Sequence, residues 1–454
     1  MQAVDLTAGT IRYAGIAEIE SVDAGVVLHR MPGWARRQHN DLSLALLETM
    51  PSGGRLEFDT AATVLAVECH LTHIQIGDAT RRPAVFDLVI DGELVDSAAT
   101  FEGTLISVDP RTGGIDLTPG GDATVTFELP SGHHHVALWL PNNAAVRLRT
   151  LSADATVTAP TRPAALRWTH YGSSISHCME ADRPTGTWPA VAARLAGADL
   201  QSFAFAGQCH LDPFAARMIA TRPADAISLK LGINIVNADS MRERTFVPAL
   251  HGFLDTIRDH QPETPITVIT PITLPCRRVP TCPPPIVDGT CRVHPTRSAG
   301  TRRRRTHPRT HTATRTRCRR RAPERRSPPA PRREGPELFG PDDVHDLPDG
   351  LHPNTTGYQR MGGTLPPHRL HRRRPVRITP VRRLGPAPSG ACGSRGATSM
   401  RLVLRAPARW ASDSAHHVTS GPSRTAPEPT GRRRRRDEPP ARRLVRCERS
   451  CDPA

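Results

Sequence analysis

The stretch Tyr171-Gly172-Ser173-Ser174-Ile175-Ser176-His177 lies between a short apolar run and the start of a predicted helix. The preceding run, residues 164–168, predicts a buried strand, and residues 188–195 have the pattern of a helix. A Gly-Ser-Ser turn at the carboxyl end of a parallel strand can present a hydroxyl group in the crevice where open α/β sheets bind ligands. Glycine and serine are also ordinary turn residues, so this stretch alone predicts only a strand, a turn and a helix.

From residue 161 onward, predicted strands alternate with predicted helices. Further strands are expected at 200–205, 226–231 and 266–270, and helices at 213–220 and 246–260. This order predicts a parallel, doubly wound α/β sheet with right-handed crossovers. Gly207 and Asn234 each follow a predicted strand, so both are expected on the same edge of the sheet as Ser174.

Residues 1–160 predict a different, all-β domain. Short runs with alternating or continuous apolar residues are separated by turn residues, and they occur at 55–58, 63–67, 85–90, 123–128 and 135–140. Many short strands at this spacing favour a β-sandwich. His133-His134-His135 falls at the start of the last of these strands. Because neighbouring strand residues point to opposite faces, three consecutive histidines are not expected to share a metal ion.

Three further stretches follow the Ser174 turn in order: Ala206-Gly207-Gln208, Leu231-Gly232-Ile233-Asn234 and Asp349-Gly350-Leu351-His352-Pro353-Asn354. Together with the turn, they resemble the four sequence blocks of the SGNH (GDSL-type) hydrolase family, namely Gly-Asp-Ser, an isolated Gly, Gly-x-Asn and Asp-x-x-His. The resemblance covers roughly residues 164–275 and 336–363. It implies a flavodoxin-like three-layer α/β/α domain. An amino-terminal sandwich is also found in part of this family, including some carbohydrate esterases.

The resemblance implies a serine ester hydrolase. Ser174 would be the nucleophile, His352 its base and Asp349 the group that orients the histidine, because serine needs a positioned base to react. The step of three residues from Asp349 to His352 lets the carboxylate bond Nδ1, which leaves Nε2 toward Ser174. The oxyanion hole would comprise the Ser174 N–H, the Gly207 N–H and the Asn234 side-chain amide.

No metal or cofactor is expected, since no Cys-x-x-Cys pair occurs among the ten cysteines. His170, His177 and His210 have no carboxylate at short spacing and are interpreted as packing or rim residues. Two positions depart from the family pattern. Ser173 replaces the commonest Asp, which is not the nucleophile, and Ile235 replaces a frequent Asp after Gly-x-Asn.

The expected substrate is a small acyl ester, with acetylated carbohydrate as one candidate. One alternative is a catalytically impaired remnant, or a carbohydrate-binding protein that retains the sandwich. Another is a nucleic-acid binder, but the arginine-rich segments almost lack the aromatic residues on which bases stack. No specific nucleic-acid or membrane partner is therefore expected. The amino terminus lacks a signal pattern and no long apolar run occurs, which predicts a cytoplasmic protein.

Charge divides the chain into two unlike parts. Residues 1–275 hold 20 basic and 30 acidic side chains, whereas residues 276–454 hold 40 basic and 14 acidic ones, and Lys230 is the only lysine. Arginine and proline have GC-rich codons, so GC-rich DNA read in a wrong frame gives a sequence rich in these residues. We therefore interpret residues 276–335 and the residues from 364 onward as out-of-frame translation. Such segments cannot bury enough apolar surface to order themselves.

The chain is accordingly divided into a sandwich (1–160), a first hydrolase part (161–275), a disordered segment (276–335), an Asp-x-x-His block (336–363) and a disordered tail (364–454). The hydrolase fold needs a fifth strand before Asp349 and a helix after Gly362, and neither is expected in these arginine-rich segments. The sequence therefore predicts a weak or inactive esterase.

Overall fold

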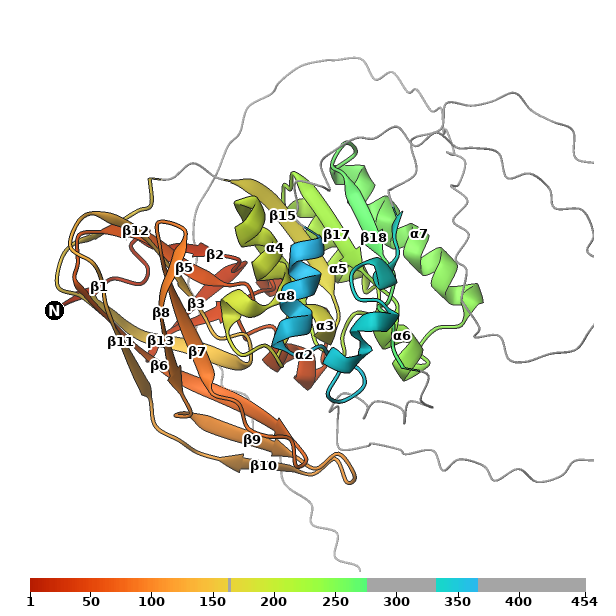
Figure 1. Cartoon of the computed structure of the whole chain (residues 1–454), viewed down its shortest axis with the longest axis horizontal. Coiled ribbons are helices and arrows are strands. Elements are labelled where there is room, and N and C mark those ends of the chain that lie inside the picture. Colours follow the sequence, from red (N-terminus) through yellow and green to blue (C-terminus); the bar gives the residue numbers. More distant parts are fainter. Residues whose placement is uncertain (162–164, 276–331, 366–454) are drawn as a thin grey trace, which may run out of the picture. The chain divides into compact units, whose positions relative to one another are not determined.

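The computed structural model describes residues 1–161, 165–275 and 332–365. Within these residues the chain forms two mostly antiparallel sheets before residue 160 and one parallel sheet after residue 165 (Figure 1). The predicted fold class, an all-β region followed by an α/β domain, is thus confirmed. Most of the two segments predicted to be disordered lies outside the described residues.

The strands of the first sheet are β1 (Gln2–Val4), β3 (Glu18–Val22), β4 (Gly25–His29), β6 (Val64–Ile76), β9 (Thr104–Val108), β10 (Ile115–Thr118), β11 (Ala123–Glu128) and β13 (Ala144–Ala153). Their order is β10-β9-β6-β13-β4-β3, with β1 beside β13 and β11 beside β6. The second sheet contains β2 (Arg12–Ala14), β5 (Arg55–Thr60), β7 (Ala84–Ile90), β8 (Glu93–Thr100), β12 (His134–Trp139) and β14 (Val157–Thr158). Its order is β14-β5-β12-β7-β8, with β2 beside β5.

The two sheets share one apolar core. In β11 every second residue is buried, and Val125 and Phe127 point inward, as the alternating sequence predicts. They join Phe86 and Leu88 from the opposite sheet in the same cluster, which is the arrangement of a β-sandwich. Two short helices, α1 (Gly33–Arg36) and α2 (Leu42–Leu47), interrupt the strands between β4 and β5.

The parallel sheet carries the second domain. Its strands are β15 (Leu166–Gly172), β16 (Ala198–Ala204), β17 (Ala226–Lys230), β18 (Ile266–Ile269) and β19 (Arg332–Arg333). Every pair is parallel, in the order β16-β15-β17-β18-β19. In sequence terms this is the order 2-1-3-4-5 of flavodoxin-like folds.

The helices of this domain are α3 (Ser174–His177), α4 (Trp188–Ala196), α5 (Pro213–Thr221), α6 (Ile233–Ala238), α7 (Glu243–His260) and α8 (Thr355–Thr364), with 3-10 segments at Pro184–Gly186, Gly335–Glu337 and Pro341–Asp346. On one face of the sheet His170 contacts Trp188 of α4, edge to face at 4.8 Å between ring centroids. On the other face Tyr171 stacks on Phe253 of α7 at 5.3 Å. Helix α8 lies along α4 (Figure 1), and α5 packs with α7, which completes three layers.

Two expectations about the end of this domain are wrong. Arg332–Arg333, inside the segment predicted to be disordered, form β19 and pair with β18. Strand pairing uses backbone groups, so an arginine-rich composition does not prevent it. The expected loss of the last helix is also contradicted, because α8 runs to Thr364 and Leu365 is buried. Tyr358 and Met361 give α8 an apolar face, and the Asn354 side chain accepts the Gly357 N–H as a cap.

Candidate active site

Ser174 stands where the central strand β15 turns into α3. It is the first residue of that helix, so its backbone N–H has no partner within the helix. A side chain on the preceding Gly172 would meet the Ser176 hydroxyl at 2.5 Å and His170 Nε2 at 3.1 Å. Only glycine fits this close turn. The Ser174 side chain is partly exposed, whereas its neighbours Ser173 and Ser176 are fully buried.

His352 and Asp349 come from the loop before α8 and meet Ser174. Nε2 of His352 lies 2.9 Å from Ser174 Oγ, and Nδ1 lies 2.7 Å from Asp349 Oδ2. The second oxygen of Asp349 accepts the backbone N–H groups of Leu351 and His352 at 2.8 and 2.7 Å. One carboxylate thus shapes the loop and orients the ring. With the proton on Nδ1, Nε2 is free to accept the Ser174 hydroxyl proton.

Neighbouring charges shift the pKa values of both Asp349 and His352. The pKa of Asp349 is lowered to about 2, because burial, which favours the neutral acid, is outweighed by the hydrogen bonds and charge of His352 and by two backbone N–H donors. Burial opposes the charged form of His352, but the negative charges of Glu180 and Asp349 outweigh it and raise the pKa of the ring. Lys230 acts in the opposite direction.

Glu180 was not predicted from the sequence. Its Oε1 lies 3.6 Å from Nδ1 of His352, and its Oε2 accepts the Tyr358 hydroxyl at 2.9 Å. Tyr358 is fully buried in α8. Glu180 lies six residues after Ser174 in a turn without a periodic pattern, so only the fold brings it to the histidine.

The sandwich domain holds the turn that carries Ser174. The Asn142 side chain donates to the Cys178 carbonyl at 2.6 Å, and the backbone carbonyl of Asn142 accepts from His177 Nε2 at 3.0 Å. The Ser52 hydroxyl donates to the His177 carbonyl at 2.8 Å. These buried bonds from the sandwich fix the carboxyl end of α3.

Gly207 and Asn234 lie at the carboxyl edge of the sheet, as expected. Gly207 follows β16 with a φ of +74°, a conformation that favours glycine. Asn234 is the second residue of α6, in the turn that follows β17, and its Oδ1 accepts the Cys209 N–H at 3.0 Å. This bond ties the two loops together and leaves the amide NH₂ of Asn234 available as a donor. Ile235 is buried.

The remaining histidines have structural contacts. His170 is fully buried and bonds Ser228, His177 bonds Asn142, and His210 contacts Ser240 and the Gly207 carbonyl. In the histidine run, His134 pairs with Asp91 and His135 with Asp59, at 2.8 and 2.9 Å. Each has its own carboxylate, and no group of three metal-binding side chains occurs among the described residues.

Lys230, noted in the sequence as the only lysine, ends β17 in the protein interior. Its side chain is 1% exposed, and Nζ has no hydrogen-bond partner within the described part of the chain. Burial lowers the pKa of this amine to about 8. Its charge acts on His170, Cys178, Cys209 and His352. No sequence pattern marked Lys230 as part of the site.

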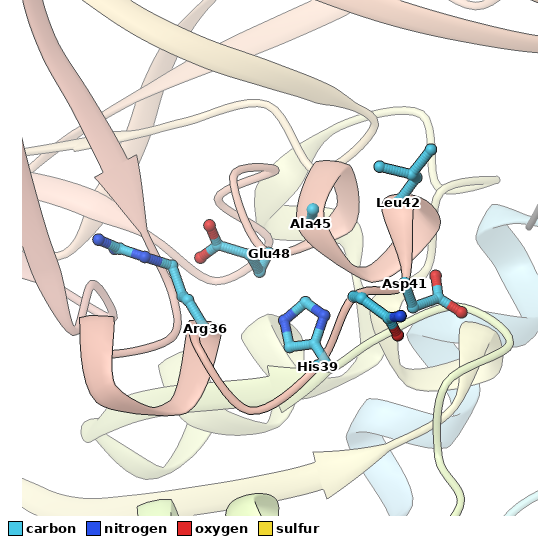
Figure 2. A pocket seen from close by; sticks show the side chains of 7 residues that line it. Arg36, His39, Asp41, Leu42, Ala45 and Glu48 are labelled. Carbon is cyan, nitrogen blue, oxygen red and sulfur yellow. The ribbon is translucent and has the colours of Figure 1, made fainter. Parts of the chain in front are cut away.

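A pocket of about 150 Å³ lies beside α1 and α2, and Figure 2 shows the His39 ring between Arg36 and Asp41. Its lining residues are Arg36, His39, Asn40, Asp41, Leu42, Ala45 and Glu48. Gln208, next to Gly207, donates to Asp41 Oδ2 at 3.4 Å, so the pocket borders the Gly207 loop. Ser174, Asp349 and His352 do not line it, and the pocket is therefore not the place of the Ser174 chemistry.

Comparison with known proteins agrees with this fold. Residues 170–360 match the model of the GDSL-like lipase/acylhydrolase family, so this part of the chain is a GDSL-like lipase/acylhydrolase domain, as the sequence predicted. The chain is consequently an enzyme that acts on carboxylic esters, either a hydrolase or an acyltransferase. No match was found among curated proteins. No helix in the described residues is long and apolar enough to cross a membrane.

Several solved structures are similar. A salicylyl-acyltransferase, SsfX3, from a tetracycline biosynthetic pathway is 25% identical, with a TM-score of 0.61 over 80% of this chain and 95% of its own. A putative GDSL-like lipase from Bacteroides ovatus is 18% identical, with a TM-score of 0.49 over 77% of this chain and 94% of its own. A family two carbohydrate esterase from Clostridium thermocellum is 15% identical, with a TM-score of 0.39 over 58% of this chain and 78% of its own.

Proposed function

We propose that this protein is a serine ester hydrolase in which Ser174, His352 and Asp349 act as a catalytic triad. The observation that carries the proposal is the continuous contact from Ser174 Oγ to His352 Nε2, at 2.9 Å, and from Nδ1 to Asp349, at 2.7 Å. In the first step Oγ bonds the ester carbonyl carbon while its proton passes to Nε2. The imidazolium then gives that proton to the departing alcohol, which leaves an acyl group on Ser174.

Water completes the cycle. His352 accepts a proton from the water as its oxygen attacks the acyl group, and the ring returns that proton to Ser174 Oγ as the acid leaves. Both steps pass through an oxyanion, for which the Ser174 N–H, the Gly207 N–H and the Asn234 NH₂ are the proposed donors. Loss of one such donor typically slows a reaction by about 10²–10³-fold, so Asn234→Ala is expected to retain well under a tenth of the parent rate.

The proposed substrate is a small acyl ester, with an acetylated carbohydrate as the first candidate. The partial exposure of Ser174 at the sheet edge supports attack on an ester that reaches the edge from solvent. Proteins with the same kind of domain include carbohydrate esterases, which is the reason for testing acetylated sugars first.

Covalent labelling tests the nucleophile directly. A fluorophosphonate should modify the full chain once, at Ser174, and peptide mass spectrometry should find the adduct on the peptide that contains it. Labelling should disappear in Ser174→Ala and slow strongly in His352→Ala, because the base is missing. A label on another residue, or equal labelling of Ser174→Ala, would show that the nucleophile is assigned wrongly.

A second candidate is acyl transfer to an alcohol in place of water. It is supported by the similarity to the salicylyl-acyltransferase over most of both chains. The same acyl-enzyme serves both reactions, so the two differ only in the acceptor. Product analysis with an added alcohol distinguishes them: an ester product that dominates over free acid at millimolar alcohol favours transfer, and free acid alone favours hydrolysis.

A further inference from the structure

Two carboxylates face the same nitrogen of His352. Asp349 Oδ2 lies 2.7 Å from Nδ1, and Glu180 Oε1 lies 3.6 Å from it. The shorter contact is a hydrogen bond, whereas 3.6 Å is beyond hydrogen-bond distance and acts through charge. A ring nitrogen has one proton to donate, so the second carboxylate is not needed to fix the tautomer while Asp349 is present.

Glu180 is held in this place from α8. The Tyr358 hydroxyl donates to Oε2 at 2.9 Å, and the other oxygen faces His352. Complete burial, together with the neighbouring charge of Glu180, raises the pKa of Tyr358 well above its ordinary value. The phenol therefore stays protonated and remains a donor over the working pH range.

The backbone before Glu180 is also constrained. Cys178 has a φ of +60° and a ψ of +48°, the left-handed conformation, which costs a residue other than glycine about 1–2 kcal/mol. Its carbonyl accepts both the Asn142 side chain, at 2.6 Å, and the Ala181 N–H, at 3.0 Å. Such strain persists only where surrounding contacts impose it, and here it turns the chain so that Glu180 faces the histidine.

We propose that Glu180, held by Tyr358, is a positioning residue for the catalytic histidine and a second carboxylate partner of its Nδ1. It stabilises the imidazolium that forms when the Ser174 proton moves to Nε2, and it takes over the Nδ1 proton bond when Asp349 is removed. This inference rests on the proposed function, because it assigns a role relative to the Ser174–His352 proton transfer.

Because charged groups surround His352, the proposal predicts shifts in the pH dependence of activity. Asp349 faces the ring from its own loop, Glu180 from the turn after α3, and Lys230 from β17. Glu180→Gln removes a negative charge, so the imidazolium becomes less stable and the acid limb of the activity profile moves to lower pH. Lys230→Met removes a positive charge and moves the limb to higher pH.

A double-mutant cycle tests the partnership. The full chain, Glu180→Gln, Asp349→Asn and the double variant are compared by kcat/KM on p-nitrophenyl acetate between about pH 5 and 9, the range in which a histidine titrates. The amide oxygen introduced by Glu180→Gln would still accept the Tyr358 hydroxyl, so the packing is kept. We expect Asp349→Asn to lose less than the roughly 10⁴-fold seen when a triad has one orienting carboxylate. The double variant should lose at least about tenfold more than the product of the single losses.

The inference is overturned if Glu180→Gln leaves the acid limb in place and the two losses multiply. The unfolding midpoint of Glu180→Gln shows whether this variant folds. If it does not, Tyr358→Phe is made in the Asp349→Asn background instead. This change releases Glu180 without altering the charge of Glu180, so it should deepen the loss of kcat/KM. Ser174→Ala is run alongside. Full activity in Ser174→Ala contradicts the proposed function itself, whereas an inactive Ser174→Ala with no Glu180 effect contradicts only this inference.

Discussion

Gly362 sets how closely α8 can lie on α4. A side chain added there would meet Val191 Cβ at 2.5 Å and the Trp188 carbonyl oxygen at 2.8 Å. The second of these is backbone, so Gly362→Ala must push the helices apart. Overpacking of this kind costs about 1–3 kcal/mol, against which alanine returns about 1 kcal/mol of helix propensity. We expect a net loss of up to about 2 kcal/mol in the free energy of unfolding.

Gly363, the next residue of the same helix, is the matched control. A side chain added there meets nothing within 4 Å, so Gly363→Ala should keep the packing and gain up to about 1 kcal/mol. Urea unfolding measures both variants. Gly362→Ala should also lower kcat/KM, because α8 begins beside His352 and a shift of about 1 Å at a catalytic group costs roughly 10²-fold. If Gly362→Ala is as stable and as active as Gly363→Ala, the described packing of α8 is wrong.

Four further predictions concern charge and the domain contact. Activity should fall on the acid side at a pH above the ordinary value of 6.5 for histidine, because the pKa of His352 is raised and its neutral form is the base; a pH profile of kcat/KM checks this. The two groups of this pair affect unfolding in opposite directions: the contribution of His352 is present below pH 6.5 and is lost as pH rises through its raised pKa, whereas that of Asp349 is present above pH 3.8 and is lost as pH falls through about 2. Lys230→Met should be more stable than the parent below pH 8 by roughly 3 kcal/mol, the worth of lowering the amine pKa from 10.5 to about 8, and the difference should shrink as pH rises toward 10.5; equal unfolding curves at neutral pH would contradict it. Asn142→Ala should cost about 0.5–1.5 kcal/mol by removing the side-chain donor to the Cys178 carbonyl, while His177 keeps its bond to the backbone carbonyl of residue 142, and it should lower kcat; a variant with unchanged kcat would show that the sandwich does not support the Ser174 turn.

Much of this architecture follows from sequence periodicity. The alternation in Ala123–Glu128 and the apolar runs that became β15, β16, β17 and β18 decide the two kinds of sheet, because each pattern buries its residues in only one way. Each of the four motif blocks is ordinary at a turn, and they were found because they occur together in the order of the blocks of a known family. Their meeting at one edge then follows from the parallel order of the strands.

Other features have no local signal. Glu180 and Lys230 matter through distances to His352 that join residues far apart in the sequence, and a single charged residue in a turn or a strand end does not encode such a distance. The short strand β19 was missed because two arginines carry no apolar period, although their backbone still pairs with β18. Helix α8 was underestimated because the basic, proline-rich sequence from residue 364 onward suggested that no helix could form there, whereas α8 ends at Thr364 and packs on α4 at Gly362.

The expectation of weak activity in the chain as written stays a prediction, and sequencing the gene tests its cause. Insertions or deletions are expected near codons 276–290, 335 and 363, and their correction should raise the activity by orders of magnitude. A confirmed reading frame in a fully active protein would contradict the interpretation of the arginine-rich text as out of frame.

The most direct test of the central claim compares three serines of one turn. The hydroxyls of Ser173 and Ser176 are buried without hydrogen-bond partners among the described residues, so alanine at either position should fold and retain most of the activity. Ser174→Ala removes the proposed nucleophile and should reduce kcat on p-nitrophenyl acetate by about 10⁶-fold or to the background rate. Hydrolysis by Ser174→Ala at the rate of Ser173→Ala and Ser176→Ala would contradict the assignment of Ser174 as the nucleophile.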